Sequence, residues 1–193
     1  MTTITVSDGS ELYYEVHGQG TRTIVFAHGA AGNHMSWWQQ IPHYRDDYRC
    51  LTFDHRGWGA STDATGMSLR GFAGDLDAIL GDAGVDDLVL VAQSMGGFTA
   101  LPFAAAHPDR VRGLLMADTV LGIGDEELIG ELRAGFAERG NPKLQDRLRL
   151  TTMLADSYVD KHPEGVFLYQ QVSSLNNPPE ISSDFSAAEG SVP

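Results

Sequence analysis

A serine stands where a buried strand is predicted to turn sharply into a helix, within the segment Leu88–Gly97 (LVLVAQSMGG). The apolar run Leu88–Ala92 is typical of a strand buried on both faces, and an Ala-rich helical segment follows the glycines. A strained turn of this kind points the serine hydroxyl away from the sheet and places backbone N–H groups beside it. Strand and helix nearly touch there, so the residues two before and two after the serine must be small, and they are Ala92 and Gly96. Ser94 is therefore a candidate nucleophile.

The turn resembles the nucleophile elbow of the α/β-hydrolase family, usually written G-x-S-x-G. This chain departs from the pattern at the first position, where Ala92 stands for glycine, but alanine is still small. A second stretch adds to the resemblance. The short β-rich run Thr23–Ala27 ends in His28-Gly29-Ala30-Ala31-Gly32, and family members begin the corresponding loop with His-Gly.

The resemblance implies an oxyanion hole made by two backbone N–H groups. One donor would be Ala30, the residue after the His-Gly pair, and the other would be Met95, the residue after the nucleophile. Two N–H groups aimed at one point stabilise negative charge on an acyl oxygen, and losing one such donor typically costs about 3–4 kcal/mol. His28 is interpreted as a structural residue that bonds the loop backbone, not as a base.

A third stretch, Asp54–Ser61 (DHRGWGAS), is similar to the family turn D-x-R-G-x-G-x-S. In the family its Asp and Arg are usually structural and fasten the loop through charge-assisted hydrogen bonds. We therefore interpret Asp54, His55 and Arg56 as structural residues, although a neighbouring Asp and His suggest catalysis at first sight.

Strands alternate with helices at short spacing up to about residue 119. The alternation predicts βαβ units and an α/β fold: a mostly parallel, doubly wound sheet covered on both faces, preceded by a hairpin around the turn Ser7–Ser10. Ser94, Ala30, Asp54 and Asp118 all come just after the ends of predicted strands. Open α/β sheets place their sites at these carboxyl ends.

From Val120 the pattern changes to helices only, and three helical segments are expected, near Asp125, near Asn141-Pro142 and over Glu164–Leu175. The α/β-hydrolase resemblance implies that they form a cap inserted after the sixth core strand, whose apolar faces would make the acyl or ring pocket. The expected divisions are a core over 1–119, a helical cap over 120–180, and a linker over 181–193 that leads back toward a missing C-terminal part of the core.

A nucleophilic serine needs a base, and the family order is Ser, then Asp or Glu, then His. After Ser94 the only histidines are His107, expected at the far end of the following helix, and His162, expected in a cap connection; we assign neither as the base. Asp118 is a candidate acid, since some members place the acid after the sixth strand; a loop-capping Asp-Thr pair or a later acid are the alternatives. We expect the catalytic His and the last strands to come from a C-terminal segment or a second chain.

The composition restricts the partners. Asp and Glu number 26 against 13 Lys and Arg, and the formal net charge of −13 argues against nucleic acid or an anionic membrane. No apolar run approaches the roughly 20 residues of a membrane span. The N-terminus lacks a signal-peptide pattern, and the single cysteine, Cys50, is interpreted as a buried small residue, so we expect a cytoplasmic protein. The motifs imply a small-molecule substrate, no metal and no organic cofactor.

These patterns predict a serine hydrolase that cleaves a small ester, lactone or related carbonyl compound through an acyl-enzyme on Ser94. C–C bond hydrolysis and cofactor-free perhydrolysis stay open, because they share the motifs. Haloalkane dehalogenation is disfavoured, because that branch of the family uses Asp as the nucleophile. The alternative from another class is a catalytically inactive binding or interaction module, or an inactive fragment, that keeps the hydrolase fold.

Overall fold

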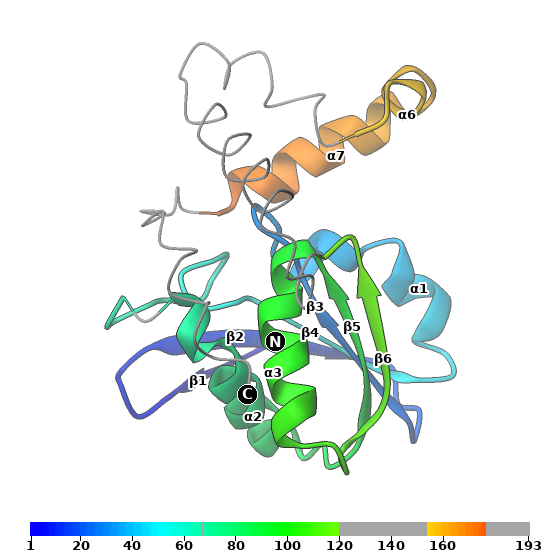
Figure 1. Ribbon diagram of the computed structural model, residues 1–193. Coiled ribbons are helices and arrows are strands. Elements are labelled where there is room, and N and C mark those ends of the chain that lie inside the picture. Colours follow the sequence, from blue (N-terminus) through cyan, green and yellow to red (C-terminus); the bar gives the residue numbers. More distant parts are fainter. Residues whose placement is uncertain (67, 120–153, 177–193) are drawn as a thin grey trace, which may run out of the picture. The chain divides into compact units, whose positions relative to one another are not determined.

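The computed structural model of the chain describes residues 1–66, 68–119 and 154–176. Six strands form one sheet with the order β1-β2-β4-β3-β5-β6 (Figure 1). They are β1 (Thr2–Thr5), β2 (Glu11–His17), β3 (Thr23–Ala27), β4 (Arg49–Phe53), β5 (Leu88–Gln93) and β6 (Val111–Ala117). The pairs β1–β2 and β2–β4 are antiparallel, and β4, β3, β5 and β6 run parallel. The predicted α/β fold with an N-terminal hairpin is confirmed.

Each connection between consecutive parallel strands carries a 3-10 helix followed by an α-helix. The 3-10 helices are η1 (His34–Trp37), η2 (Ser68–Gly71) and η3 (Ser94–Gly96), and the α-helices are α1 (Gln40–Tyr44), α2 (Phe72–Ala83), α3 (Gly97–Ala106), α6 (Asp156–Lys161) and α7 (Pro163–Ser174). Helix α2 ends at Gly84, whose φ of +63° suits a left-handed helix end. None of the described helices is long and apolar enough to cross a bilayer.

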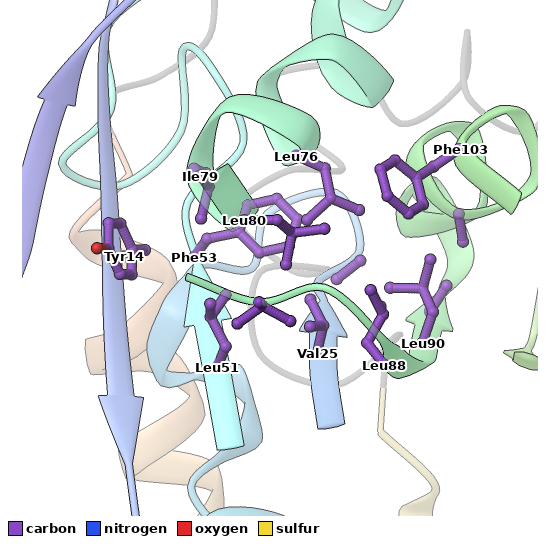
Figure 2. Close-up of a cluster of buried hydrophobic side chains, with 14 of the residues drawn as sticks. Tyr14, Val25, Leu51, Phe53, Leu76, Ile79, Leu80, Leu88, Leu90 and Phe103 are labelled. Carbon is purple, nitrogen blue, oxygen red and sulfur yellow. The ribbon is translucent and has the colours of Figure 1, made fainter. Parts of the chain in front are cut away.

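The main hydrophobic core lies between one face of the sheet and the two helices α2 and α3. Leu76, Ile79 and Leu80 form the apolar stripe of α2, and all three are fully buried (Figure 2). They pack, with Phe103 of α3, against a common set of strand residues: Val25, Leu51, Phe53, Leu88 and Leu90. Replacing one of these large buried side chains by alanine should cost about 2–5 kcal/mol.

A second, smaller cluster lies on the opposite face of the sheet. Ile24 and Phe26 alternate along β3 with Val25, which belongs to the main core, so they lie on the other face of the sheet. They pack with Cys50 of β4 and Ile41 of α1. Helices therefore cover both faces, as the doubly wound prediction requires. The prediction that Cys50 is a buried small residue is confirmed, and burial raises the pKa of its thiol.

The chain divides into two compact units, Met1–Leu121 with Leu175–Pro193, and Gly122–Ser174. Helices α6 and α7 belong to the second unit and are joined at His162. The helix predicted over Glu164–Leu175 is confirmed as α7. The segments predicted to be helical near Asp125 and Asn141, and the predicted linker over 181–193, lie outside the described residues.

Candidate active site

The carboxyl ends of the parallel strands meet at one edge of the sheet. The last residues in register are paired as follows: Phe26 with Thr52, Ala27 with Ala92, and Gln93 with Ala117. Neighbouring strands lie about 4.8 Å apart. The loops that begin at His28, Asp54, Ser94 and Asp118 therefore start side by side, although 90 residues of sequence separate the first from the last.

The turn at Ser94 has a strained backbone. Ser94 has a φ of +47°, in the left-handed region that side chains disfavour. Gln93 is still extended, with φ −120° and ψ 131°, and η3 starts at Ser94 and leads directly into α3. Holding a non-glycine residue in this conformation costs on the order of 1–3 kcal/mol. A Cβ at Gly96 would collide with the carbonyl oxygen of Ala27, so the small residue predicted there is required.

The loop after β3 forms a tight turn over Gly29–Gly32. The Gly32 N–H donates to the Gly29 carbonyl at 3.0 Å, and Ala31 has a φ of +64°, the sign that a type II turn requires at its third position. A Cβ built on Gly29 would lie only 3.2 Å from the Cβ of Ser94. The Gly29–Gly32 turn therefore passes directly beside the candidate nucleophile.

Both predicted oxyanion donors lie in these two turns. Ala30 is exposed, and no hydrogen bond among the described residues uses its N–H. Met95 lies in the first turn of η3, where backbone N–H groups have no partner inside the helix. Ala30 thus lies in the turn that passes beside Ser94, and Met95 follows Ser94 directly in η3; their role in catalysis stays a prediction.

His28 is fully buried and holds the peptide group that precedes Ala30. Its Nδ1 lies 2.8 Å from the Gly29 oxygen, and its Nε2 lies 3.1 Å from the His55 backbone N–H. A backbone N–H can only donate, so Nε2 accepts and Nδ1 carries the proton. Burial lowers the pKa of His28 to about 4, which keeps the ring neutral at pH 7. The Gly29 carbonyl and the Ala30 N–H belong to one planar group, so His28 fixes the direction of that N–H.

His55 is buried as well, and its ring nitrogens are engaged. Its Nε2–H donates to the His28 carbonyl at 3.1 Å, and its Nδ1 accepts from the Thr99 hydroxyl at 3.3 Å. The ring stacks on Phe72 with a centroid separation of 4.3 Å. Burial and the neighbouring His28 lower the pKa of His55 well below its usual value. The predictions that His28 and His55 are structural are confirmed by these bonds.

Asp54 is fully buried and ties η1 to the loop after β4. Its carboxylate accepts hydrogen bonds from the His34 backbone N–H, the Ala60 N–H at 2.8 Å, and the His34 ring Nδ1 at 2.9 Å. Burial would lower the pKa of His34, but the bond to Asp54 outweighs it and raises that pKa. Sequence reasoning missed this pairing, because 20 residues separate its partners and only the register of β3 with β4 joins them.

Arg56 is enclosed by carboxylates. Its Nε donates to Asp75 at 2.6 Å, its second Nη also reaches Asp75, and its first Nη donates to Asp8 at 2.8 Å. This bidentate pair fastens the Asp54–Ser61 loop to α2 and to the β1–β2 turn. The interpretation of Asp54 and Arg56 as structural residues is therefore confirmed.

Asp118 directly follows β6 and Ser94 directly follows β5, each one position beyond the last register pair, Gln93–Ala117. Asp118 also has a left-handed φ, of +51°, and is exposed. Among the described residues no hydrogen bond engages its carboxylate. Asp118 and Ser94 therefore begin neighbouring loops at the carboxyl ends of β6 and β5, and the role of Asp118 as the acid stays a prediction.

No histidine of the described residues bonds Ser94, and all seven histidines of the chain are described. His107 ends α3, the helix that starts after Ser94 and spans about 15 Å at 1.5 Å per residue. His162 lies between α6 and α7 in the second unit. No described histidine therefore holds the Ser94 hydroxyl in the way a general base would.

An open groove of about 580 Å³ lies elsewhere, between β1, the following turn and α2. It is lined by residues of β1, α2 and the adjoining loops, including Arg56, which bonds Asp8 and Asp75. None of its residues belongs to the turns at Gly29–Gly32 or Ser94. No cluster of side chains in the described residues could hold a metal ion.

A sequence model of the alpha/beta hydrolase fold matches residues 22–151, more than half of the chain. The chain belongs to the α/β-hydrolase fold family. Among relatives of this chain, the non-heme chloroperoxidase CPO-A1 of Kitasatospora aureofaciens is 36% identical over 123 residues, which are 62% of this chain and 44% of that protein. The 3-oxoadipate enol-lactonase 2 of Acinetobacter baylyi is 30% identical over 127 residues, 65% of this chain and 47% of that protein.

Solved structures extend the likeness to the fold. A thermophilic esterase from Thermogutta terrifontis is 28% identical, with a TM-score of 0.72 over 92% of this α/β-hydrolase chain and 67% of the esterase. The chain spans less than half the length of the two curated relatives named above.

Proposed function

We propose that this α/β hydrolase is a serine hydrolase that cleaves a small ester, lactone or related carbonyl compound through an acyl-enzyme on Ser94. The observation that carries the proposal is the strained φ of +47° at Ser94, in a turn that the Gly29–Gly32 loop approaches to contact distance. Strain of this kind persists at functional sites because the presented hydroxyl requires it. A relative that is a lactonase and a neighbour that is an esterase support the substrate class.

In the proposed reaction the Ser94 Oγ attacks the acyl carbon while a base removes its proton. The carbonyl oxygen takes the negative charge and accepts hydrogen bonds from the N–H groups of Ala30 and Met95. The tetrahedral intermediate collapses, the alcohol leaves with the proton from the base, and the acyl group stays on Ser94. Water then repeats the sequence and releases the acid.

The base is an imidazole from outside these 193 residues, in a C-terminal segment or a second chain, and Asp118 or a later carboxylate orients it. The neutral, fully engaged rings of His28 and His55 support an outside base, because neither has a nitrogen free to accept the Ser94 proton. The second unit, with α6 and α7, is proposed as the cap that supplies the acyl pocket.

A second candidate is a catalytically inactive binding module. The observation that favours it is that no histidine of the described residues bonds Ser94. A module of this kind would keep the pocket but would have no base, so the two candidates differ in whether Ser94 is nucleophilic.

A serine-directed fluorophosphonate tests the proposal by intact-mass spectrometry. A single adduct that disappears in Ser94→Ala is expected from the hydrolase, and the mass of the labelled species shows whether a longer chain or a partner supplies the base. Absence of an adduct, at the mass of these 193 residues alone, favours the binding module.

A further inference from the structure

The side chain of Asn176 bridges two loops of the candidate site. Its Nδ2 donates to the Ala31 carbonyl at 2.7 Å, and its Oδ1 accepts from the Gly59 N–H at 3.0 Å. The Gly59 N–H can only donate, which assigns the amide orientation. The chain returns to the first unit at Leu175, so Asn176 lies in the same unit as both loops.

One part of the Gly29–Gly32 turn is held by hydrogen bonds, and the other part is exposed. His28 and Gly32 bond the Gly29 carbonyl from within, whereas Ala30 and Ala31 are exposed. Ala31 has a φ of +64°, a conformation that relaxes readily toward negative φ if nothing holds the following peptide group. The bond from Asn176 to the Ala31 oxygen holds that group.

The other end of the bridge is rigid. Gly59 lies in the Asp54–Ser61 loop, where a Cβ at Gly59 would collide with the buried Asp54 carboxylate. Asp54 itself is held by His34 and Ala60. Asn176 therefore links a strained, exposed turn to a loop that the buried Asp54 already holds.

We propose that Asn176 is a positioning residue of the oxyanion hole. It keeps the Ala31–Gly32 peptide in place and so, together with the bond between His28 and the Gly29 carbonyl, maintains the direction of the Ala30 N–H toward the acyl oxygen on Ser94. This inference rests on the proposed function, because it assigns Asn176 a part in the same site. Small displacements of a reacting group can cost on the order of 10²-fold in rate, and we expect a loss of roughly 10-fold in kcat when the carboxamide is removed.

Amide hydrogen exchange in the 193-residue chain tests the positioning without requiring activity. In Asn176→Ala the Gly32 and Gly59 amides should exchange roughly five-fold faster, the factor that one net hydrogen bond contributes. Asn176→Asp keeps an acceptor for Gly59 but places a carboxylate oxygen against the Ala31 carbonyl. In that variant only Gly32 should lose protection.

The matched control is Ser174→Ala, because Ser174 is an exposed neighbour in sequence whose hydroxyl bonds only within α7, to Gln171. It should leave both amides unchanged. Unchanged exchange at Gly32 in both Asn176 variants overturns the proposal.

The catalytic consequence is measured on the protein with its base present, using an ester and the matching thionoester. Sulfur is a poor acceptor for a preorganised oxyanion hole, so the wild type should strongly prefer the ester. Asn176→Ala should lower kcat for the ester and reduce that preference, with little change in KM.

A merely structural role would lower the ester and thionoester rates equally. Either that result or an unchanged kcat for the ester overturns the positioning role, even if the Gly32 and Gly59 amides exchange faster. A wild-type protein without turnover or Ser94 labelling refutes the proposed function itself, whatever the exchange data show. The two failures are thus distinguishable.

Discussion

The turn at Ser94 and the loop Asp54–Ser61 begin at the same edge of the sheet, and both carry residues that could do chemistry. They differ in burial, in backbone strain and in the hydrogen-bond partners of those residues. Ser94 has a strained φ and a partly exposed side chain. Asp54 and Arg56 are buried and bonded to His34, Ala60, Asp75 and Asp8.

The difference separates a candidate catalytic group from a structural one. A reactive side chain must have bonding capacity left for a substrate, and its presentation is maintained at a cost to local stability. A side chain whose donors and acceptors are all used inside the protein stabilises the fold instead. Residue type alone would have favoured the Asp-His-Arg loop as the catalytic one.

The largest expected effect is at Ser94. Ser94→Gly removes both the hydroxyl and the strain, so turnover should fall by roughly 10⁶-fold, the order of loss seen when a catalytic serine is removed. The free energy of unfolding should rise by about 1 kcal/mol, because glycine adopts positive φ without penalty. Urea unfolding and phosphonate labelling measure the two effects. Ser94→Ala should also lose labelling, but its free energy of unfolding should not rise. If Ser94→Gly is less stable than Ser94→Ala, the turn at Ser94 is not strained.

The next largest effect is on stability, at Arg56 in the Asp54–Ser61 loop. Arg56→Ala leaves Asp75 buried without its partner and should lower the free energy of unfolding by about 3–5 kcal/mol. Arg112→Ala is the control, because the Arg112 side chain is 65% exposed in its pair with Asp87, against 3% for Arg56. An exposed pair contributes about 0–1 kcal/mol. Equal destabilisation by the two variants in urea unfolding would show that burial does not make the Arg56 pair more important to stability than the exposed Arg112 pair.

Acid should weaken the turn through His28. Its folded pKa of about 4 lies below the unfolded value of 6.5, so the unfolded chain binds the proton first. The stability that neutral His28 contributes is complete above about pH 6.5 and is lost as the pH falls toward 4, in total about 3 kcal/mol at 1.4 kcal/mol per unit.

His55 acts in the same direction, whereas the raised pKa of His34 contributes stability that is present at low pH and lost as the pH rises through that pKa. Ring resonances followed by NMR therefore isolate His28. Titration of the His28 ring near pH 6.5 would show that it is not held neutral.

The smallest expected effect compares two glycines. Gly96→Ala should destabilise by about 1–3 kcal/mol, because the new methyl group meets the backbone of Ala27. Gly81→Ala, in α2 with open space around it, should instead stabilise by about 0.5–1 kcal/mol. Thermal unfolding of both variants checks the sign. A neutral Gly96→Ala would mean that strand and helix do not approach closely at the elbow.

Prediction from sequence succeeded where the signal is local. The apolar run before Ser94, the small residues on either side of it, and the alternation of strands with helices all depend on neighbours within a few residues. These patterns determined the sheet, the hairpin and the position of the serine turn, because backbone conformation and burial of a strand follow from short-range periodicity.

Only the tertiary structure decided which polar groups have hydrogen-bond partners inside the protein. His28 meets His55, His55 meets Thr99, and Asn176 meets Ala31 across 27, 44 and 145 residues of sequence. The sequence alone placed Asn176 only as the residue after the helix predicted over Glu164–Leu175. Contacts of this length depend on strand order and register, which bring the loop ends together, and no local pattern encodes them.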